Sequence, residues 1–338
     1  MTKTRDQWID LVKIYACILV VLGHFFQSMV SSEILSSTPL YEWFNRTIYY
    51  FHVPLFFICS GFLYQKYSTV RSVSRWGCNV LKKALSLGIP YFVFSLITYG
   101  LKVLFSGSVN NEAQGLLESL FLNPIPPYWY LYALFLLFFI TPTAKSRREA
   151  VILMIASVLL KCLCFTAAKN IHVLRYIFEN EVWFVLGMFL CTFDAPATMK
   201  KMKLAWGVVG SIVFIVLSIV FQWWNGILAF FMGALGCFCT LLIFVRLEDL
   251  SSLKNVYRVS KYTFPVFLLH TIFAAGLRSV LFKIGIVNPF LHVILGLIIS
   301  FAGPMLAAVI MSKFKWMEFF LYPNKIIRIG RDKKCQKS

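Results

Sequence analysis

The most regular feature of the sequence is a succession of apolar runs separated by short polar segments. About 20 apolar residues in a helix cross the hydrocarbon core of a bilayer, and most of the runs approach that length. The pattern therefore predicts an all-α integral membrane protein, a bundle of about ten transmembrane helices. The runs are Trp8–Val30, Thr47–Gln65, Ala84–Leu104, Tyr128–Ile140, Ala150–Ala168, Glu181–Phe193, Leu204–Phe221, Gly226–Val245, Tyr262–Phe282 and Pro289–Met311.

The composition supports this prediction and argues against several other classes of protein. Of the 338 residues, 59% are hydrophobic and only 14% are charged, whereas an average soluble domain has roughly 25% charged residues. We therefore exclude a soluble globular enzyme, a disordered chain and a disulfide-stabilised secreted module. The nine cysteines are an odd number and lie mostly inside apolar runs, so they are interpreted as small core residues rather than as a disulfide framework.

The basic residues predict the orientation of the chain in the membrane. The net charge is +19, and most of the 33 Lys and Arg residues fall in the segments that lie inside if the N-terminus is cytoplasmic. This distribution obeys the positive-inside rule, so both termini are expected to be cytoplasmic. No soluble segment is long enough for a nucleic-acid-binding module, and we expect membrane lipid, but no nucleic acid, among the partners.

The first apolar run carries three ionisable residues, Asp10, Lys13 and His24, although such groups are costly inside a bilayer. At 100° per residue, the side chains of Lys13 and His24 lie only about 20° apart on a helix. Asp10 and Lys13 have the i, i+3 spacing of a local ion pair. The stripe is a candidate functional site, because a neutral imidazole is the usual general base near pH 7. The alternative is structural: a histidine that links helices, and an acid and a base that neutralise each other.

Several short motifs follow one another along the chain. In this order they resemble the membrane acyltransferase-3 family, whose members acylate bacterial surface glycans. Each motif is weak alone, but together they cover essentially the whole chain. They are R-D-x-x-x-D-x-x-K from Arg5 to Lys13, A-C-I-L-V-V-L-G-H ending at His24, F-H-V-P-L-F-F-I-C-S-G-F-L from Phe51, K-K-A-L-S-L-G-I-P-Y-F from Lys82, Y-W-Y-L from Tyr128, S-K-Y-T-F-P-V-F-L-L-H ending at His270, and Y-P-N-K from Tyr322.

The resemblance implies roles for particular residues. His24 matches the motif histidine proposed as the catalytic base, Lys13 matches its basic partner, and Asp10 completes the catalytic set. Lys82 and Lys83 match the basic cluster thought to approach the phosphates of acyl-CoA, which is expected to dock near these two residues and Lys13. The alternative is that Lys82 and Lys83 only anchor the chain at the inner face of the membrane. No bound cofactor and no metal are expected, and acyl-CoA, with acetyl-CoA the expected form, is a co-substrate.

Four further residues are expected to support the site or to face the acceptor. His52 and His270 match family positions and could hydrogen-bond in the core. Trp129 lies at a predicted outer interface, where it either joins an aromatic belt or faces a sugar. Ser60 has no acid–base partner at a recognisable spacing, and helix packing is the favoured interpretation of the Ser60–Gly61 pair.

The resemblance leads to one predicted function and leaves one alternative. Residues 1–312 are expected to form an acyltransferase-3-like transmembrane domain of the inner membrane, and residues 313–338 a basic cytoplasmic tail. The predicted function is transfer of an acyl group from cytosolic acyl-CoA to a hydroxyl of a cell-surface glycan or its lipid-linked precursor. His24 acts either as the general base or as a nucleophile that forms an acyl-imidazole. The alternative is an exporter or transporter of a small molecule or glycan that uses the same stripe, for which paired broken helices in two matching halves would be the signature; no matching halves are found.

Overall fold

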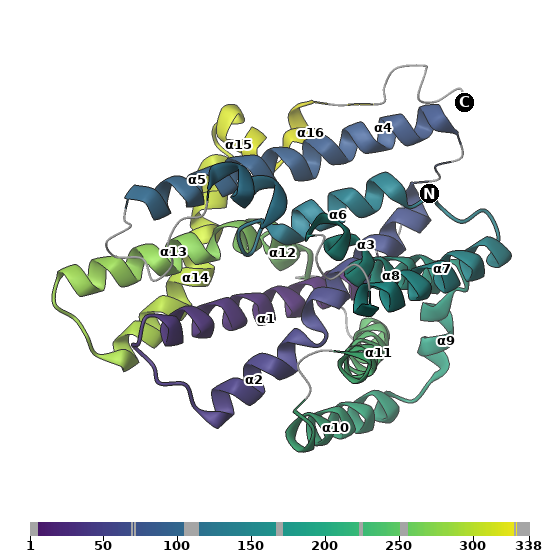
Figure 1. Cartoon of the computed structure of the whole chain (residues 1–338), viewed down its shortest axis with the longest axis horizontal. Helices are drawn as coiled ribbons and strands as arrows, with labels where there is room; N and C mark the ends of the chain where they lie inside the picture. The colour runs from purple at the N-terminus through teal and green to yellow at the C-terminus, as the bar shows by residue number, and fades with distance from the viewer. Residues whose placement is uncertain are drawn as a thin grey trace. The chain divides into compact units, whose positions relative to one another are not determined.

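The computed structural model describes residues 6–68, 70, 72–104, 115–166, 172–222, 226–250, 256–327 and 329. Every regular element among these residues is a helix (Figure 1), which confirms the prediction of an all-α chain. Arg5 and most of the predicted tail beyond residue 327 lie outside the described residues. The chain divides into two compact units: Met1–Tyr67, Ser146–Val158 and Val182–Thr263 form the first, and Ser68–Lys145, Leu159–Glu181 and Phe264–Ser338 form the second.

The first unit is arranged around its N-terminal helix. Residues at the helical spacing i, i+4 and i+8, such as Val12, Ala16 and Val20, are buried, so that one apolar face of this helix lies in the core of the unit. The N-terminal helix, α1 (Gln7–Ser31), contacts four others: α2 (Pro39–Tyr49), α3 (His52–Tyr67), α11 (Ile227–Leu250) and α12 (Val256–Ser260) (Figure 1). Two further helices of the unit, α9 (Ala195–Lys201) and α10 (Leu204–Val220), contact α11.

Helix α2 is an element that the apolar pattern did not predict. Its start is fixed by Thr38, whose side chain accepts a hydrogen bond from the Tyr41 backbone N–H at 3.2 Å, and by Pro39 at the first helical position. The predicted second run, Thr47–Gln65, was therefore too short. The helical segment Pro39–Tyr67 has 29 residues and is apolar enough to cross a membrane.

The second unit contains a helical segment of 32 residues with a change of helix type in its middle. It consists of α4 (Val73–Lys83), the π-helical turn η1 (Ala84–Gly88) and α5 (Ile89–Leu104). Pro90 follows η1 and has no N–H to donate to the carbonyl of residue 86, as an α-helix would require. Single π-helical turns often occur at functional sites, and this one directly follows Lys82 and Lys83.

The remaining helices of the second unit pack against this segment and against one another. α6 (Trp129–Ile140) contacts α4 and η1, and η3 (Glu118–Leu122) contacts α5. α15 (Lys315–Leu321) contacts α5 and α14 (Pro289–Met311), and α16 (Pro323–Ile326) contacts η1. Nearly all of α13 (Thr263–Lys283) also belongs to this unit.

Two helices, α7 (Arg147–Thr166) and α8 (His172–Thr192), contribute residues to both units. In the first unit, α8 crosses α3 without intervening side chains. A Cβ atom added to Gly61 would collide with the backbone carbonyl of Phe184, and one added to Gly187 would collide with the carbonyl of Ile58. Small residues let membrane helices approach this closely. Gly61 therefore serves helix packing.

The structure supports a multi-pass membrane protein but does not confirm ten spans. Among the described residues, six helical segments are long and apolar enough to cross a membrane, and the number rises to seven if α8 and α9, bent by 72°, count as one span. α6 with 12 residues and α10 with 17 are apolar but short, and α7 begins with Arg147, Arg148 and Glu149. The six segments are Gln7–Ser31, Pro39–Tyr67, Val73–Leu104, Ile227–Glu248, Thr263–Lys283 and Pro289–Met311.

Five of the described free cysteines fit the interpretation as core residues, whereas Cys162 is exposed and Cys191 is half-buried. Cys17, Cys59, Cys164, Cys237 and Cys239 are free and buried. Cys78, in contrast, is disulfide-bonded, which the odd number of cysteines did not predict.

Candidate functional site

The three ionisable residues of the predicted stripe all lie on α1. Asp10 is buried, whereas Lys13 and His24 are partly exposed. Lys13 and His24 are separated by roughly 16 Å along the helix axis, at 1.5 Å per residue. The two side chains share a face but are too far apart to bond to each other. They can therefore contact two different parts of one extended substrate.

Between Lys13 and His24, this face of α1 carries a buried cysteine, Cys17. Cys17 is 3% exposed, and its Sγ lies 3.4 Å from the backbone carbonyl oxygen of Thr263, the first residue of α13. Val20 and Val21, which follow on α1, are also buried. The stripe thus has a polar end at Lys13, an apolar middle and a second polar end at His24.

Three side chains near the His24 end of α1 are hydrogen-bonded to one another. The Tyr49 hydroxyl donates to Gln27 Oε1 at 3.1 Å, and Gln27 Nε2 donates to Asn45 Oδ1 at 3.2 Å. Gln27 follows His24 by three residues, so it lies on the next turn of the same face. We refer to Gln27, Asn45 and Tyr49 as the amide–phenol cluster.

Tyr49 connects this cluster to the position of His24. An added Cβ atom at Gly23 would lie 3.3 Å from Tyr49 Cε2 and 3.7 Å from the Tyr49 hydroxyl oxygen. The absence of a side chain at Gly23 therefore lets the Tyr49 ring rest directly on the backbone beside His24. This cluster was not predicted from the sequence. The H-F-F-Q spacing could have indicated Gln27, but Asn45 and Tyr49 belong to α2.

The His52 side chain packs against the Tyr49 ring. His52 is 1% exposed, and its Nδ1 lies 2.6 Å from the carbonyl oxygen of Ile48. A carbonyl oxygen only accepts hydrogen bonds, so Nδ1 carries the proton and Nε2 is left as the acceptor of the neutral ring. The His52 and Tyr49 rings meet edge to face, with centroids 4.6 Å apart. His52 is thus placed to orient Tyr49, while Ser60, also on α3, is half-buried.

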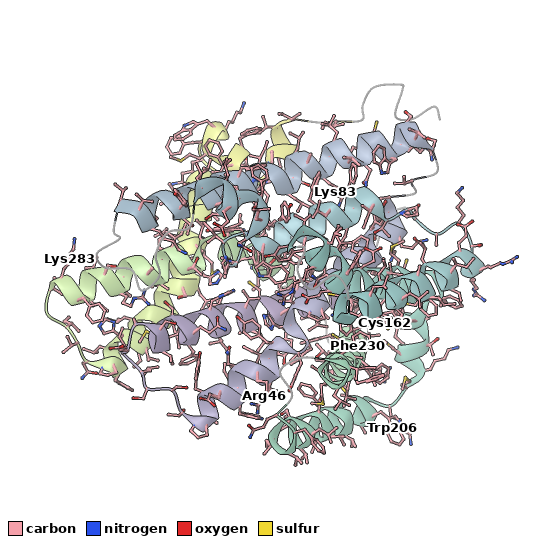
Figure 2. The ribbon with its side chains drawn as sticks, viewed as in Figure 1. Arg46, Lys83, Cys162, Trp206, Phe230 and Lys283 are labelled. Atoms are coloured by element: carbon pink, nitrogen blue, oxygen red, sulfur yellow. The ribbon has the colours of Figure 1, made fainter. Side chains whose placement is uncertain are left out.

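The predicted donor-binding lysines lie in the second unit, at the end of α4. Lys82 is exposed, and its backbone carbonyl accepts a hydrogen bond from the Asn324 side chain at 3.5 Å. Lys83, labelled in Figure 2, is half-buried, with its Nζ 3.8 Å from the centroid of the Phe138 ring. The next residue after Asn324 is Lys325. Its Nζ forms an ion pair with Glu318 Oε1 at 2.6 Å, so its charge is already compensated.

Trp129 and His270 also belong to the second unit. Trp129 begins α6 and stacks on Tyr176 of α8, with ring centroids 5.7 Å apart. His270 is 1% exposed, and its Nδ1 lies 2.9 Å from the Val266 carbonyl and 3.0 Å from the Phe267 carbonyl. Both residues are thus held by contacts within the second unit.

The second unit contains a buried carboxylate, that of Glu181, which was not predicted as a site residue. The sequence pattern placed Glu181 at the start of an apolar run, where a charged residue is expected to be exposed. Glu181 lies well inside α8, is 6% exposed, and accepts a hydrogen bond from Thr141 Oγ1 at 2.8 Å through Oε1. Its Oε2 is buried without a hydrogen-bond partner among the described residues. Thr141 comes three residues after Phe138, on which Lys83 lies. No group of three or more metal-ligating side chains occurs in the described part of the chain.

Thr141→Val is expected to destabilise the protein, because it removes the hydroxyl donor from a buried carboxylate. Loss of a partner to a buried polar group costs about 1–3 kcal/mol. The double variant Thr141→Val/Glu181→Leu removes both polar groups and is expected to recover most of the lost stability. Unfolding of the purified protein in mixed micelles measures both effects. A single variant as stable as the wild type would show that this hydrogen bond contributes nothing.

Several apolar helices with ionisable side chains inside them define a multi-pass membrane protein with polar chemistry within its spans. The chain belongs to the acyltransferase-3 family, because the acyltransferase domain that defines this family matches residues 6–309. This match confirms the family resemblance.

One curated relative and the solved structures complete the comparison. A stretch of 139 residues is 27% identical to the nodulation protein NolL of Mesorhizobium japonicum, and covers 40% of this chain and 35% of that protein. The chain thus spans about a third of the length of this relative. No solved structure matches the chain.

Proposed function

We propose that this membrane acyltransferase takes an acyl group, expected to be acetyl, from acyl-CoA at the cytoplasmic side of the inner membrane. The acceptor is a hydroxyl group of a cell-surface glycan or of its lipid-linked precursor. The observation that carries the proposal is the placement of Lys13 and His24 on one face of α1, roughly 16 Å apart along the axis. This spacing suits an extended thioester substrate whose charged head and reactive carbonyl lie at different depths.

His24 is the proposed general base. The neutral imidazole takes the proton of the acceptor hydroxyl as the hydroxyl oxygen attacks the thioester carbonyl. The C–S bond then breaks, the coenzyme thiolate leaves, and the imidazolium returns the proton to the sulfur. General acid–base catalysis of this kind contributes about 10²–10⁴-fold to the rate. Partial exposure of His24 supports this role, because an acceptor must reach its ring.

Lys82 and Lys83 of the second unit are proposed to bind the phosphates of the coenzyme. Lysine ammonium groups bind phosphate as point charges and without a fixed geometry. The exposure of Lys82 and the π-helical turn that follows Lys83 support a phosphate site at this junction. Asp10, buried on the turn before Lys13, is proposed to orient the Lys13 ammonium group.

Lys82→Ala is expected to raise the KM for acetyl-CoA by about tenfold and to leave kcat nearly unchanged, because a lost charge-assisted contact costs roughly 1.5–3 kcal/mol and the reacting carbonyl lies elsewhere. Initial rates of coenzyme release by purified protein in liposomes, with glycan extract added, measure both constants. Lys201→Ala is the matched control, since Lys201 is also an exposed lysine at the end of a short cationic helix, α9. Equal effects of the two substitutions would reduce the role of Lys82 to general surface charge.

A further inference from the structure

We infer that the amide–phenol cluster of Gln27, Asn45 and Tyr49 binds the acceptor, and that the acceptor portion it binds is a neutral, hydroxyl-rich group such as an uncharged sugar residue. The inference rests on the proposed function, because it assigns the acceptor side of the same site. It adds three residues that lie outside the motifs of the family resemblance.

The cluster lies where a bound acceptor would present a hydroxyl to His24. Gln27 is about 4.5 Å further along the axis of α1 than His24. The Tyr49 hydroxyl oxygen would lie 3.7 Å from a Cβ atom added to Gly23, the residue before His24. These separations are comparable with the distances between hydroxyl groups on one sugar ring. A ring held by Gln27 and Tyr49 would therefore bring a neighbouring hydroxyl to the imidazole.

The cluster retains hydrogen-bonding capacity after its internal bonds are made. Gln27 uses its oxygen for Tyr49 and needs only one of its two amide hydrogens for Asn45. The Asn45 amide nitrogen has two further hydrogens, and the Tyr49 oxygen can still accept. All three side chains are half-buried rather than buried. A sugar hydroxyl, which both donates and accepts, matches this mixture of free donors and acceptors.

The charge of the surroundings favours a neutral ligand over an anionic one. The cluster itself has no charged member, and amide and phenol groups can bind hydroxyls without the cost of burying an ion. The cation of α2, Arg46, is buried at 4% exposure, and its Nη2 donates to the Ser218 carbonyl of α10 at 3.5 Å (Figure 2). The guanidinium is thus engaged with α10 and is not part of the cluster.

The geometry of the cluster is fixed before any ligand binds. The Thr38 and Pro39 cap sets the start of α2, and His52 holds the Tyr49 ring from the other side. Binding to groups that are already oriented avoids the entropy cost of ordering them. The two internal hydrogen bonds therefore prepare the site as well as joining α1 to α2.

Saturation-transfer difference NMR on the full-length protein in nanodiscs tests the inference without requiring turnover. The probes are N-acetylglucosamine and methyl glucoside as neutral sugars and glucuronate as a charged one. We expect saturation transfer to the neutral sugars in the wild type and at least a fivefold loss in Tyr49→Phe and Asn45→Ala. Tyr41→Phe, on the same helix but outside the cluster, is the control and should behave like the wild type.

Kinetics then separate this inference from the proposed function. In Tyr49→Phe, the KM for the sugar acceptor should rise about tenfold, while in the control Tyr41→Phe both this KM and the rate of acetyl-CoA consumption should match those of the wild type. The inference is overturned if the wild type binds no neutral sugar, if binding persists in both cluster variants, or if glucuronate binds better than the neutral sugars. Failure of the proposed function would instead appear as sugar binding in a protein that never consumes acetyl-CoA. Tyr49→Phe removes one oxygen atom, so it keeps the test valid if Asn45→Ala does not fold.

Discussion

His24→Ala is expected to lower kcat for acyl transfer by about 10²–10⁴-fold, the range in which a positioned general base contributes. The loss should appear in kcat, because the imidazole acts on the proton that moves in the transition state and holds neither the coenzyme phosphates nor the amide–phenol cluster. His24→Gln, which keeps much of the size and some hydrogen bonding but cannot act as a base at neutral pH, should lose as much. Stopped assays of acetyl-CoA consumption by protein in liposomes measure both variants.

The folding of the His24 variants must be measured in parallel, because a membrane histidine can also link helices. We expect both variants to have the elution volume of the wild type and nearly its melting temperature, since His24 is only partly buried. A variant that is folded and retains activity within threefold of the wild type would remove His24 from the mechanism.

Gly61→Ala is expected to have the largest effect on stability, with a loss of about 1–3 kcal/mol or more. The added Cβ would collide with the backbone carbonyl of Phe184, and a backbone cannot turn away as a flexible side chain can. α3 and α8 would have to separate along their whole contact, including the packing of Tyr64 on Phe184, whose ring centroids are 5.6 Å apart. Thermal unfolding in detergent measures the loss.

The matched control is Gly100→Ala on α5, where an added Cβ atom meets no atom within 4 Å. There the substitution only limits the freedom of the unfolded chain and should be neutral or stabilising by about 0.5–1 kcal/mol. Gly187→Ala, which collides with Ile58 at the same crossing, should resemble Gly61→Ala. A Gly61→Ala protein as stable as Gly100→Ala would contradict the close crossing of α3 and α8.

The stripe on α1 could be predicted from the sequence because it depends on one helix alone. Helical periodicity fixes the relative directions of Lys13 and His24 without any knowledge of their neighbours. The amide–phenol cluster could not be predicted in this way. It joins Gln27 of α1 to Asn45 and Tyr49 of α2, and no periodicity relates residues on two helices.

Helix boundaries were predicted less well where polar residues lie inside a helix. The second apolar run was predicted to begin at Thr47, after Glu42, Asn45 and Arg46, although these residues lie on α2 and Arg46 is buried. The sixth apolar run was predicted to begin at Glu181, whereas α8 begins at His172. The Glu181 carboxylate is buried and accepts a hydrogen bond from Thr141. A hydropathy scale treats such polar residues as exposed, because it contains no information about hydrogen-bond partners on another helix. The predicted number of spans is higher than the number of long apolar helices, because α6 and α10 are apolar but short.

The most direct test of the account follows the acetyl group itself. Purified protein in liposomes is given acetyl-CoA labelled on the acetyl group, together with a glycan extract of the cell envelope. The account predicts that labelled acetyl ester appears on the glycan in equal amount to the free coenzyme released, and that neither product forms with His24→Ala. Glycan or acyl donor that crosses the bilayer unmodified, with no acetyl-CoA consumed, would contradict the account and favour a transporter.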